Sequence, residues 1–130
     1  MKLIRVATAA VNQTPLDWDG NTNNIRRALN AARAAGASLL CLPELCITGY
    51  GCEDAFFSAA VRRMAARVLD EILPDTRGMF VSLGLPIMHA GALFNASAVL
   101  VDGRLAGLVP KQHLAGDRLH YEPRWFKPWA

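Results

Sequence analysis

The chain has 130 residues, of which 52% are hydrophobic and 19% are charged, and its formal net charge is +3. This balance is typical of a globular chain and excludes a disordered one, and the length suits one domain with a sizeable core. The basic residues of the C-terminal part are mixed with acidic ones, so the composition does not indicate a protein that binds nucleic acid.

The N-terminal sequence MKLIRVATAAVNQT has charged residues at Lys2 and Arg5 and only a short, β-branched apolar run. This pattern fits neither a signal peptide nor a membrane span. We therefore expect no membrane partner and a cytoplasmic location.

The three cysteines are Cys41, Cys46 and Cys52, and they match no disulfide framework and contain no CxxC pair. An odd number of cysteines at this spacing favours a reducing compartment and gives no reason to expect a metal site. We expect Cys41 to be a small core residue on a buried strand and the other two to pack in the loop that follows it.

The first half of the chain alternates two expected strands with a helix. Leu3 to Ala10 is a mostly apolar run typical of a buried strand, and Ser38 to Leu42 is a second one, which Pro43 ends. Between them, Asn21 to Ala35 has helical periodicity, and Gly36 stands where a helix commonly ends. The apolar positions on one face of this helix are Ile25, Ala28, Leu29 and Ala32.

The second half begins with a helix and continues with three expected strands. The helix has an apolar stripe opposite a charged face, and the stripe consists of Val61, Met64, Ala65, Val68, Leu69 and Ile72. Met79 to Pro86 is the next expected strand. Leu93 to Val101 and Arg104 to Val109 are expected to form a hairpin, because Asp102-Gly103 suits a type I′ turn. The order of elements predicts an α/β fold with a mixed sheet.

Two charged residues follow strand ends in this arrangement. Glu44 comes just after the strand that Pro43 ends, and Lys111 comes directly after the second hairpin strand. A carboxylate and an ammonium brought together could act as general base and oxyanion stabiliser in an attack on an amide. Such chemistry also needs a nucleophile, and no cysteine follows Cys52, so we expect the nucleophile to lie beyond residue 130.

Each candidate also has an ordinary structural explanation. Glu44 could cap a turn, Lys111 could be a solvated lysine after a strand, and Glu122 could pair on the surface with Arg118 or Arg124. Tyr50 either lines a substrate pocket or only packs.

The strings LPELCITGYGCEDAF, LFNASAVLVDGRLAGLVPKQ and HYEPRWFKPW resemble the nitrilase, or carbon–nitrogen hydrolase, superfamily. The closer resemblance is to the N-terminal glutaminase domain of glutamine-dependent NAD synthetases, and it covers only the front half of that domain. It implies that Glu44 is the general base, that Lys111 stabilises the oxyanion and that Glu122 orients the lysine. It also implies a cysteine nucleophile downstream and a four-layer α-β-β-α sandwich. Arg118 stands where relatives are expected to carry a glycine.

The resemblance further implies what the complete protein does. Residues 1–130 would be part of a glutamine amidotransferase domain that hydrolyses L-glutamine and passes ammonia to a synthetase domain outside this chain. That domain would use ATP and magnesium to amidate nicotinic acid adenine dinucleotide, within a homo-oligomer. No cofactor is expected in residues 1–130, which alone would be inactive. The alternatives are another amidase or carbamoylase of the superfamily, and a non-catalytic interaction module.

Overall fold

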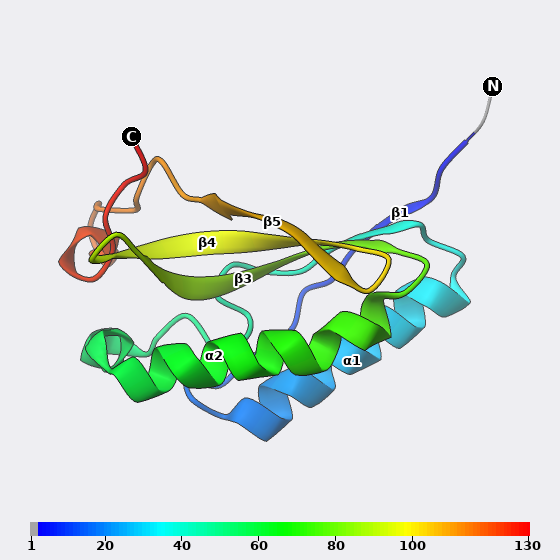
Figure 1. Ribbon diagram of the computed structural model, residues 1–130, viewed down its shortest axis with the longest axis horizontal. Coiled ribbons are helices and arrows are strands. Elements are labelled where there is room, and N and C mark those ends of the chain that lie inside the picture. Colours follow the sequence, from blue (N-terminus) through cyan, green and yellow to red (C-terminus); the bar gives the residue numbers. More distant parts are fainter. Residues whose placement is uncertain (1–2) are drawn as a thin grey trace.

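A computed structural model describes residues 3–130 as a single five-stranded sheet with two helices packed under one of its faces (Figure 1). The strands are β1 (Val6–Thr8), β2 (Leu39–Cys41), β3 (Phe80–His89), β4 (Ala92–Val101) and β5 (Arg104–Pro110). The α-helices are α1 (Trp18–Ala34) and α2 (Ala59–Ile72). Three short 3₁₀ helices complete the fold: η1 (Glu53–Phe57), η2 (Leu73–Thr76) and η3 (Glu122–Arg124).

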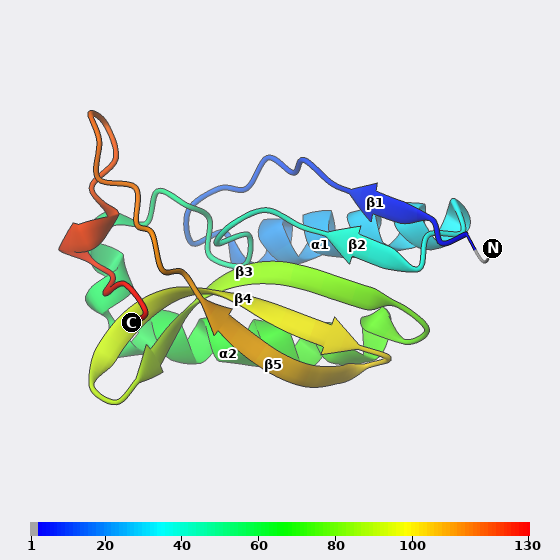
Figure 2. The ribbon, with the colours of Figure 1, turned by 90° about the horizontal axis from the view of Figure 1, so that it is seen from above.

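The sheet is mixed, as the sequence predicts. Its strand order is β1-β2-β3-β4-β5, with parallel pairs from β1 to β3 and antiparallel pairs from β3 to β5 (Figure 2). Because β1, β2 and β3 run in the same direction, the loops after β1 and β2 both leave from the carboxyl ends of the parallel strands. Loops at the carboxyl ends of parallel strands commonly carry ligand sites.

Helix α1 starts three residues earlier than its apolar periodicity predicts. The side chain of Asp17 accepts a hydrogen bond of 3.0 Å from the backbone N–H of Gly20 and caps the first turn. The C-terminal end agrees with the prediction, because Gly36 adopts a φ of 70°. In this left-handed conformation the N–H of Ala37 donates to the carbonyl of Ala32 and closes the helix.

Helix α2 presents its predicted apolar stripe to the sheet. Its buried residues pack with those of α1 and with every second residue of β2, β3 and β4 in one core. The central members of this core are Ile25, Leu29, Leu40, Val68, Leu69, Ile72, Val81, Leu83 and Leu100. Within residues 3–130, neither helix combines the length and the apolar character that a membrane crossing requires.

The turn between β4 and β5 has the backbone angles that its residues favour. Asp102 and Gly103 have φ values of 51° and 77° and join β4 to β5, which confirms the predicted type I′ turn. The prediction that the preceding strand ends at Pro86 is wrong, because β3 continues to His89. β2 pairs with β3 only up to Ser82, so Pro86 has a strand partner on one side alone, where a missing N–H costs little.

The face of the sheet opposite the helices is apolar and exposed in residues 3–130. One cross-strand row on this face consists of Val6, Leu39, Phe80 and Val101. Cys41 lies on the same face and is exposed, so the prediction of a core residue is wrong. The alternation of β2 puts only Leu40 into the core. The described residues thus form one helix layer and one sheet layer of the expected sandwich.

Candidate active site

Glu44 lies in the loop after β2, which crosses closely over β3. A Cβ atom on Gly84 would stand 2.1 Å from the backbone nitrogen of Leu45 and 2.7 Å from the carbonyl carbon of Glu44. The N–H of Ile47 donates to the carbonyl of Gly84 over 3.2 Å, and Leu45 is buried below the loop. The glycine therefore lets the loop rest on the strand and fixes where the Glu44 backbone lies.

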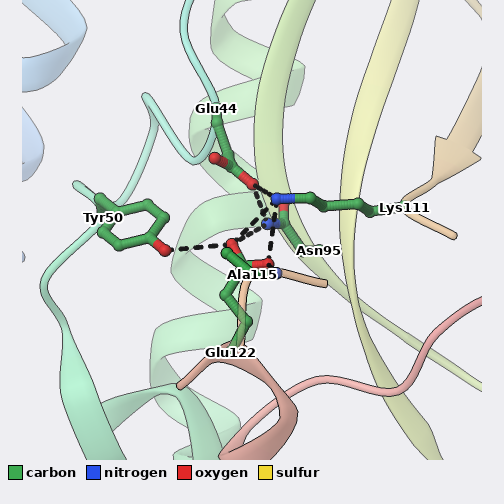
Figure 3. Close-up of polar contacts among 6 residues, drawn as sticks. All are labelled: Glu44, Tyr50, Asn95, Lys111, Ala115 and Glu122. Carbon is green, nitrogen blue, oxygen red and sulfur yellow. Dashed lines mark hydrogen bonds and ion pairs between the residues drawn. The ribbon is translucent and has the colours of Figure 1, made fainter. Parts of the chain in front are cut away.

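Lys111 follows β5 and brings an ammonium group to Glu44. The Nζ atom of Lys111 lies 2.6 Å from Oε1 of Glu44, and 3.1 Å and 3.0 Å from Oε1 and Oε2 of Glu122 (Figure 3). The structure thus brings together the three charged residues that the sequence predicts. They come from three separate segments of the chain, and a single cation bridges the two carboxylates.

Glu122 is the buried member of this cluster, with 1% of its surface exposed. Its Oε2 accepts a 2.7 Å hydrogen bond from the N–H of Ala115, and its Oε1 accepts one of 3.2 Å from the hydroxyl of Tyr50. The alternative that Glu122 pairs with Arg118 or Arg124 is wrong, because its partners all lie inside the cluster. A buried carboxylate with this many donors is held in one orientation.

The pKa shifts of Lys111 and Glu122 favour a charged ammonium facing a charged Glu122 carboxylate. Burial disfavours the ammonium of Lys111, but hydrogen bonds to Glu44 and Glu122 outweigh it and raise the pKa of Lys111. Burial likewise works against the charge of Glu122, and the N–H of Ala115 and the ammonium of Lys111 reverse this and lower the pKa of Glu122. Lys111 therefore carries its positive charge throughout the neutral range.

Tyr50 is 39% exposed and points its hydroxyl at Glu122 in the cluster. Burial and the charge of Glu122 raise its pKa to about 12, so the phenol stays protonated and donates to Glu122. Its ring meets that of His120 edge to face, with centroids 6.3 Å apart. Tyr50 contacts the cluster through Glu122 but is not among the residues that line the cavity beside Glu44 and Lys111, so its place in a substrate pocket stays a prediction.

Two polar residues support the cluster: Asn95, which sequence reasoning missed, and Asp54, to which it assigned no definite role. Asn95 on β4 donates from Nδ2 to Oε1 of Glu44 over 2.5 Å and to Oε1 of Glu122 over 3.3 Å. Asp54 in η1 accepts two hydrogen bonds from the guanidinium of Arg124 and one from the indole N–H of Trp125. These bonds fasten η3, in which Glu122 stands, to η1. For Asn95, the sequence offered one signal: a polar amide inside the apolar run LFNASAVL, which must find hydrogen-bond partners when it is buried.

Lys111 and Glu44 line a cavity of about 420 Å³. Its other walls are mostly apolar and are formed by Leu42, Pro43, Gly84, Asn95, Ala96, Ser97, Val109 and Pro110. A mostly apolar cavity with a few convergent polar groups is typical of a site for a small molecule.

The buried cysteines are poor nucleophiles. Burial raises the pKa of the Cys46 thiol to about 12 and raises that of Cys52 as well. Both thiols donate to backbone carbonyls of their own loop or of β3. This confirms the predicted packing role of these two residues.

Arg118, in the loop between Lys111 and Glu122, has a φ of 56°, a conformation that favours the glycine expected there.

Replacing Gly84 by Ala tests the close approach of the Glu44 loop. The added methyl must displace backbone rather than a mobile side chain, so we expect the free energy of unfolding to fall by about 1–3 kcal/mol. Thermal unfolding followed by circular dichroism measures this change. Gly107→Ala on β5 is the matched control, because a Cβ atom there meets nothing within 4 Å. Equal unfolding temperatures for the two variants would contradict the description of this contact.

Comparison with known proteins agrees with this geometry. The carbon-nitrogen hydrolase family matches residues 5–128. The glutamine-dependent NAD(+) synthetase of Oryza sativa subsp. indica is 37% identical, and the match covers 100% of this chain and 18% of that protein. The corresponding protein of Saccharomyces cerevisiae is 36% identical over 98% of this chain and 18% of its own length. The chain thus spans about a fifth of the length of these curated relatives.

Solved structures share the fold. The crystal structure of a glutamine-dependent NAD(+) synthetase from Cytophaga hutchinsonii has a TM-score of 0.95 and 46% identity, covering 98% of this chain and 22% of that one. An amidase from Nesterenkonia sp. has a TM-score of 0.78 and 26% identity, over 98% of this chain and 48% of the amidase. The predicted α/β fold of the nitrilase type is therefore confirmed. On the family match over residues 5–128, the chain belongs to the carbon-nitrogen hydrolase family.

Proposed function

We propose that residues 1–130 are the front part of a glutaminase domain that supplies ammonia for NAD synthesis. The observation that carries the proposal is the placement of Nζ of Lys111 between Glu44 and Glu122 at the mouth of a small cavity. The similarity to glutamine-dependent NAD(+) synthetases over almost the whole chain supports glutamine as the substrate.

The proposed reaction starts at a cysteine outside residues 1–130. A thiol has a reference pKa of about 8.5, so at neutral pH a base must remove its proton as sulfur attacks the amide carbon of glutamine. Glu44 is that base. Its carboxylate is partly exposed and lines the cavity. The electron pair of the C=O double bond moves to oxygen and forms a tetrahedral oxyanion.

Lys111 then stabilises the oxyanion. Its ammonium is already ordered by two carboxylates, so it meets the new negative charge without reorganisation. When the tetrahedral intermediate collapses, the C–N bond breaks, the proton held by Glu44 passes to nitrogen and ammonia leaves. A thioester remains. Water attacks its carbonyl carbon while Glu44 takes up one of its protons, the C–S bond breaks, this proton passes to the leaving sulfur, and glutamate and the free thiol are released.

Glu122 has an orienting role in this scheme. Its carboxylate is too deeply buried to act as a base toward a substrate. Both of its oxygens contact the ammonium of Lys111, and hydrogen bonds from the N–H of Ala115 and the hydroxyl of Tyr50 hold it in place. The position of Nζ is therefore set by the protein, as an oxyanion donor requires.

The ammonia is proposed to serve a synthetase domain in the same polypeptide, which would use ATP and magnesium to amidate nicotinic acid adenine dinucleotide. The donor set of residues 3–130 does not suit magnesium, since no group of three His, Cys, Asp or Glu side chains gathers there. We therefore place no step of that reaction in this part of the protein. A cytoplasmic homo-oligomer remains our expectation for the complete protein.

The test compares nitrogen donors for the purified full-length polypeptide. We expect ammonia release from L-glutamine to exceed release from simple aliphatic amides and N-carbamoyl amino acids at equal concentration. A preference for either of the latter would instead favour an amidase or a carbamoylase, the former represented by the similar Nesterenkonia protein. Residues 1–130 alone, which lack the proposed nucleophile, are expected to release none.

A further inference from the structure

Asn95 occupies the centre of the charged cluster. It stands on β4 with 3% of its surface exposed, and its side-chain NH₂ group donates to Oε1 of Glu44 and to Oε1 of Glu122 (Figure 3). Its backbone carbonyl accepts the N–H of Lys111 over 2.8 Å. One residue thus contacts all three charged residues, and it does so from the interior of a strand paired on both sides.

The charges of the cluster explain why such a residue is needed. Two carboxylates share one ammonium, so the cluster carries an excess negative charge in a partly buried place. Carboxylates that share a site repel one another and favour the uptake of a proton by one of them. An amide NH₂ has two hydrogens, one for each carboxylate, and adds no charge of its own. It also stays uncharged at every physiological pH, unlike a second lysine.

The geometry of the amide also limits where the two carboxylates can lie. Both accept from the same nitrogen, and that nitrogen is fixed to a rigid strand. The oxygens that hold Nζ of Lys111 are the same two Oε1 atoms, so one amide nitrogen and one ammonium nitrogen each bridge the same pair. Any shift of the Asn95 amide therefore moves both carboxylates that hold Lys111.

We propose that Asn95 is a positioning residue that holds Glu44 and Glu122 at a set separation and thereby aims Lys111 at the oxyanion. The proposal rests on the proposed glutaminase function. Asn95 also lines the cavity, but its NH₂ group donates to the two glutamates, and the proposed role rests on these two bonds. Its action is through the glutamates, and the titratable side chains that face it in the cluster are Glu44, Tyr50, Lys111 and Glu122.

The test uses Asn95→Ala in the full-length polypeptide, with Asn21→Ala as matched control. Asn21 is also a buried asparagine, 1% exposed, and its side chain makes three hydrogen bonds, to Thr14 and Ile47, none of which involves a member of the charged cluster. We expect Asn95→Ala to lower glutamine-dependent kcat/KM by about 10- to 100-fold, the usual effect of removing a residue that orients active-site groups. Asn21→Ala should stay within a few-fold of the unmodified protein, measured below its unfolding temperature.

A pH profile separates positioning from loss of structure. Without the two donated hydrogen bonds, the doubly ionised carboxylate pair is less stable, so it takes up a proton at a higher pH. The acid limb of glutamine-dependent kcat/KM should therefore move to higher pH in Asn95→Ala and stay in place in Asn21→Ala. Ammonium-dependent synthesis should be unchanged in both variants.

Asn95→Asp provides a second variant of nearly the same size. It replaces the donor NH₂ group by an oxygen of a third carboxylate, so we expect a larger loss than in Asn95→Ala at neutral pH, with the fold retained as judged by circular dichroism. Full activity of Asn95→Ala, or equal losses in Asn95→Ala and Asn21→Ala with no pH shift, would overturn the proposal. If both variants of Asn95 fail to fold, the amide is a structural residue and the proposal is also overturned. Failure of the unmodified protein to use glutamine would instead overturn the proposed function.

Discussion

Replacing Lys111 by Met is expected to lower glutamine-dependent turnover by about two orders of magnitude or more. Methionine keeps most of the length of the side chain but removes the ammonium that lies 2.6 Å from Glu44 and 3.0 Å from Glu122. Loss of one fixed donor to an oxyanion typically costs about 2.7–4 kcal/mol of transition-state stabilisation. The change also leaves two carboxylates close together without their cation, which adds to the loss.

Synthesis from free ammonium should survive in the same variant, because that route bypasses amide hydrolysis. The measurement is NAD formation from both nitrogen sources in parallel, with circular dichroism as the folding control. Lys127→Met is the matched control, since Lys127 is exposed and no ion pair of the described residues involves it. If both nitrogen sources are affected equally in a folded variant, Lys111 does not serve glutamine hydrolysis.

Replacing Glu44 by Gln is expected to have a comparable effect for a different reason. Glutamine retains an oxygen that can accept from Lys111 and Asn95, so the geometry of the loop is preserved. It cannot take a proton from a thiol. Positioned general bases contribute about 10²–10⁴-fold, and we expect glutamine-dependent kcat/KM to fall within this range.

Glu71→Gln is the control for this change, because Glu71 is exposed on α2, remote from the cluster. Ammonium-dependent synthesis again reports the integrity of the rest of the protein. Retention of more than a tenth of the glutamine-dependent activity in Glu44→Gln would mean that another group accepts the thiol proton.

Much of this fold follows from local patterns. The stripe of α2, the end of α1 at Gly36 and the Asp102-Gly103 turn depend on neighbours in the sequence, and the structure confirms all three. The errors arise where tertiary context decides. Pro86 is tolerated because β2 has already ended, and Cys41 is exposed because β2 has only one face in the core.

The charged cluster could be predicted only in part. Strand ends and family-like strings pointed to Glu44, Lys111 and Glu122. Glu44 and Glu122 share the ammonium of Lys111 because the loop after β2 and the segment around η3 meet over β4. No local sequence pattern encodes this meeting. The role of Asn95 could not be predicted, because a single amide in an apolar strand produces no periodic pattern. Its significance comes from its two partners, which are 51 and 27 residues away.

The most direct test of the account follows the amide nitrogen of glutamine. The full-length polypeptide is incubated with nicotinic acid adenine dinucleotide, ATP, magnesium and glutamine labelled with ¹⁵N in its amide, and the product is analysed by mass spectrometry. The account predicts label in the carboxamide of NAD with the unmodified protein and almost none with Lys111→Met, whereas ¹⁵N-ammonium should label the product with both. Equal transfer of the glutamine label by the two proteins would contradict it.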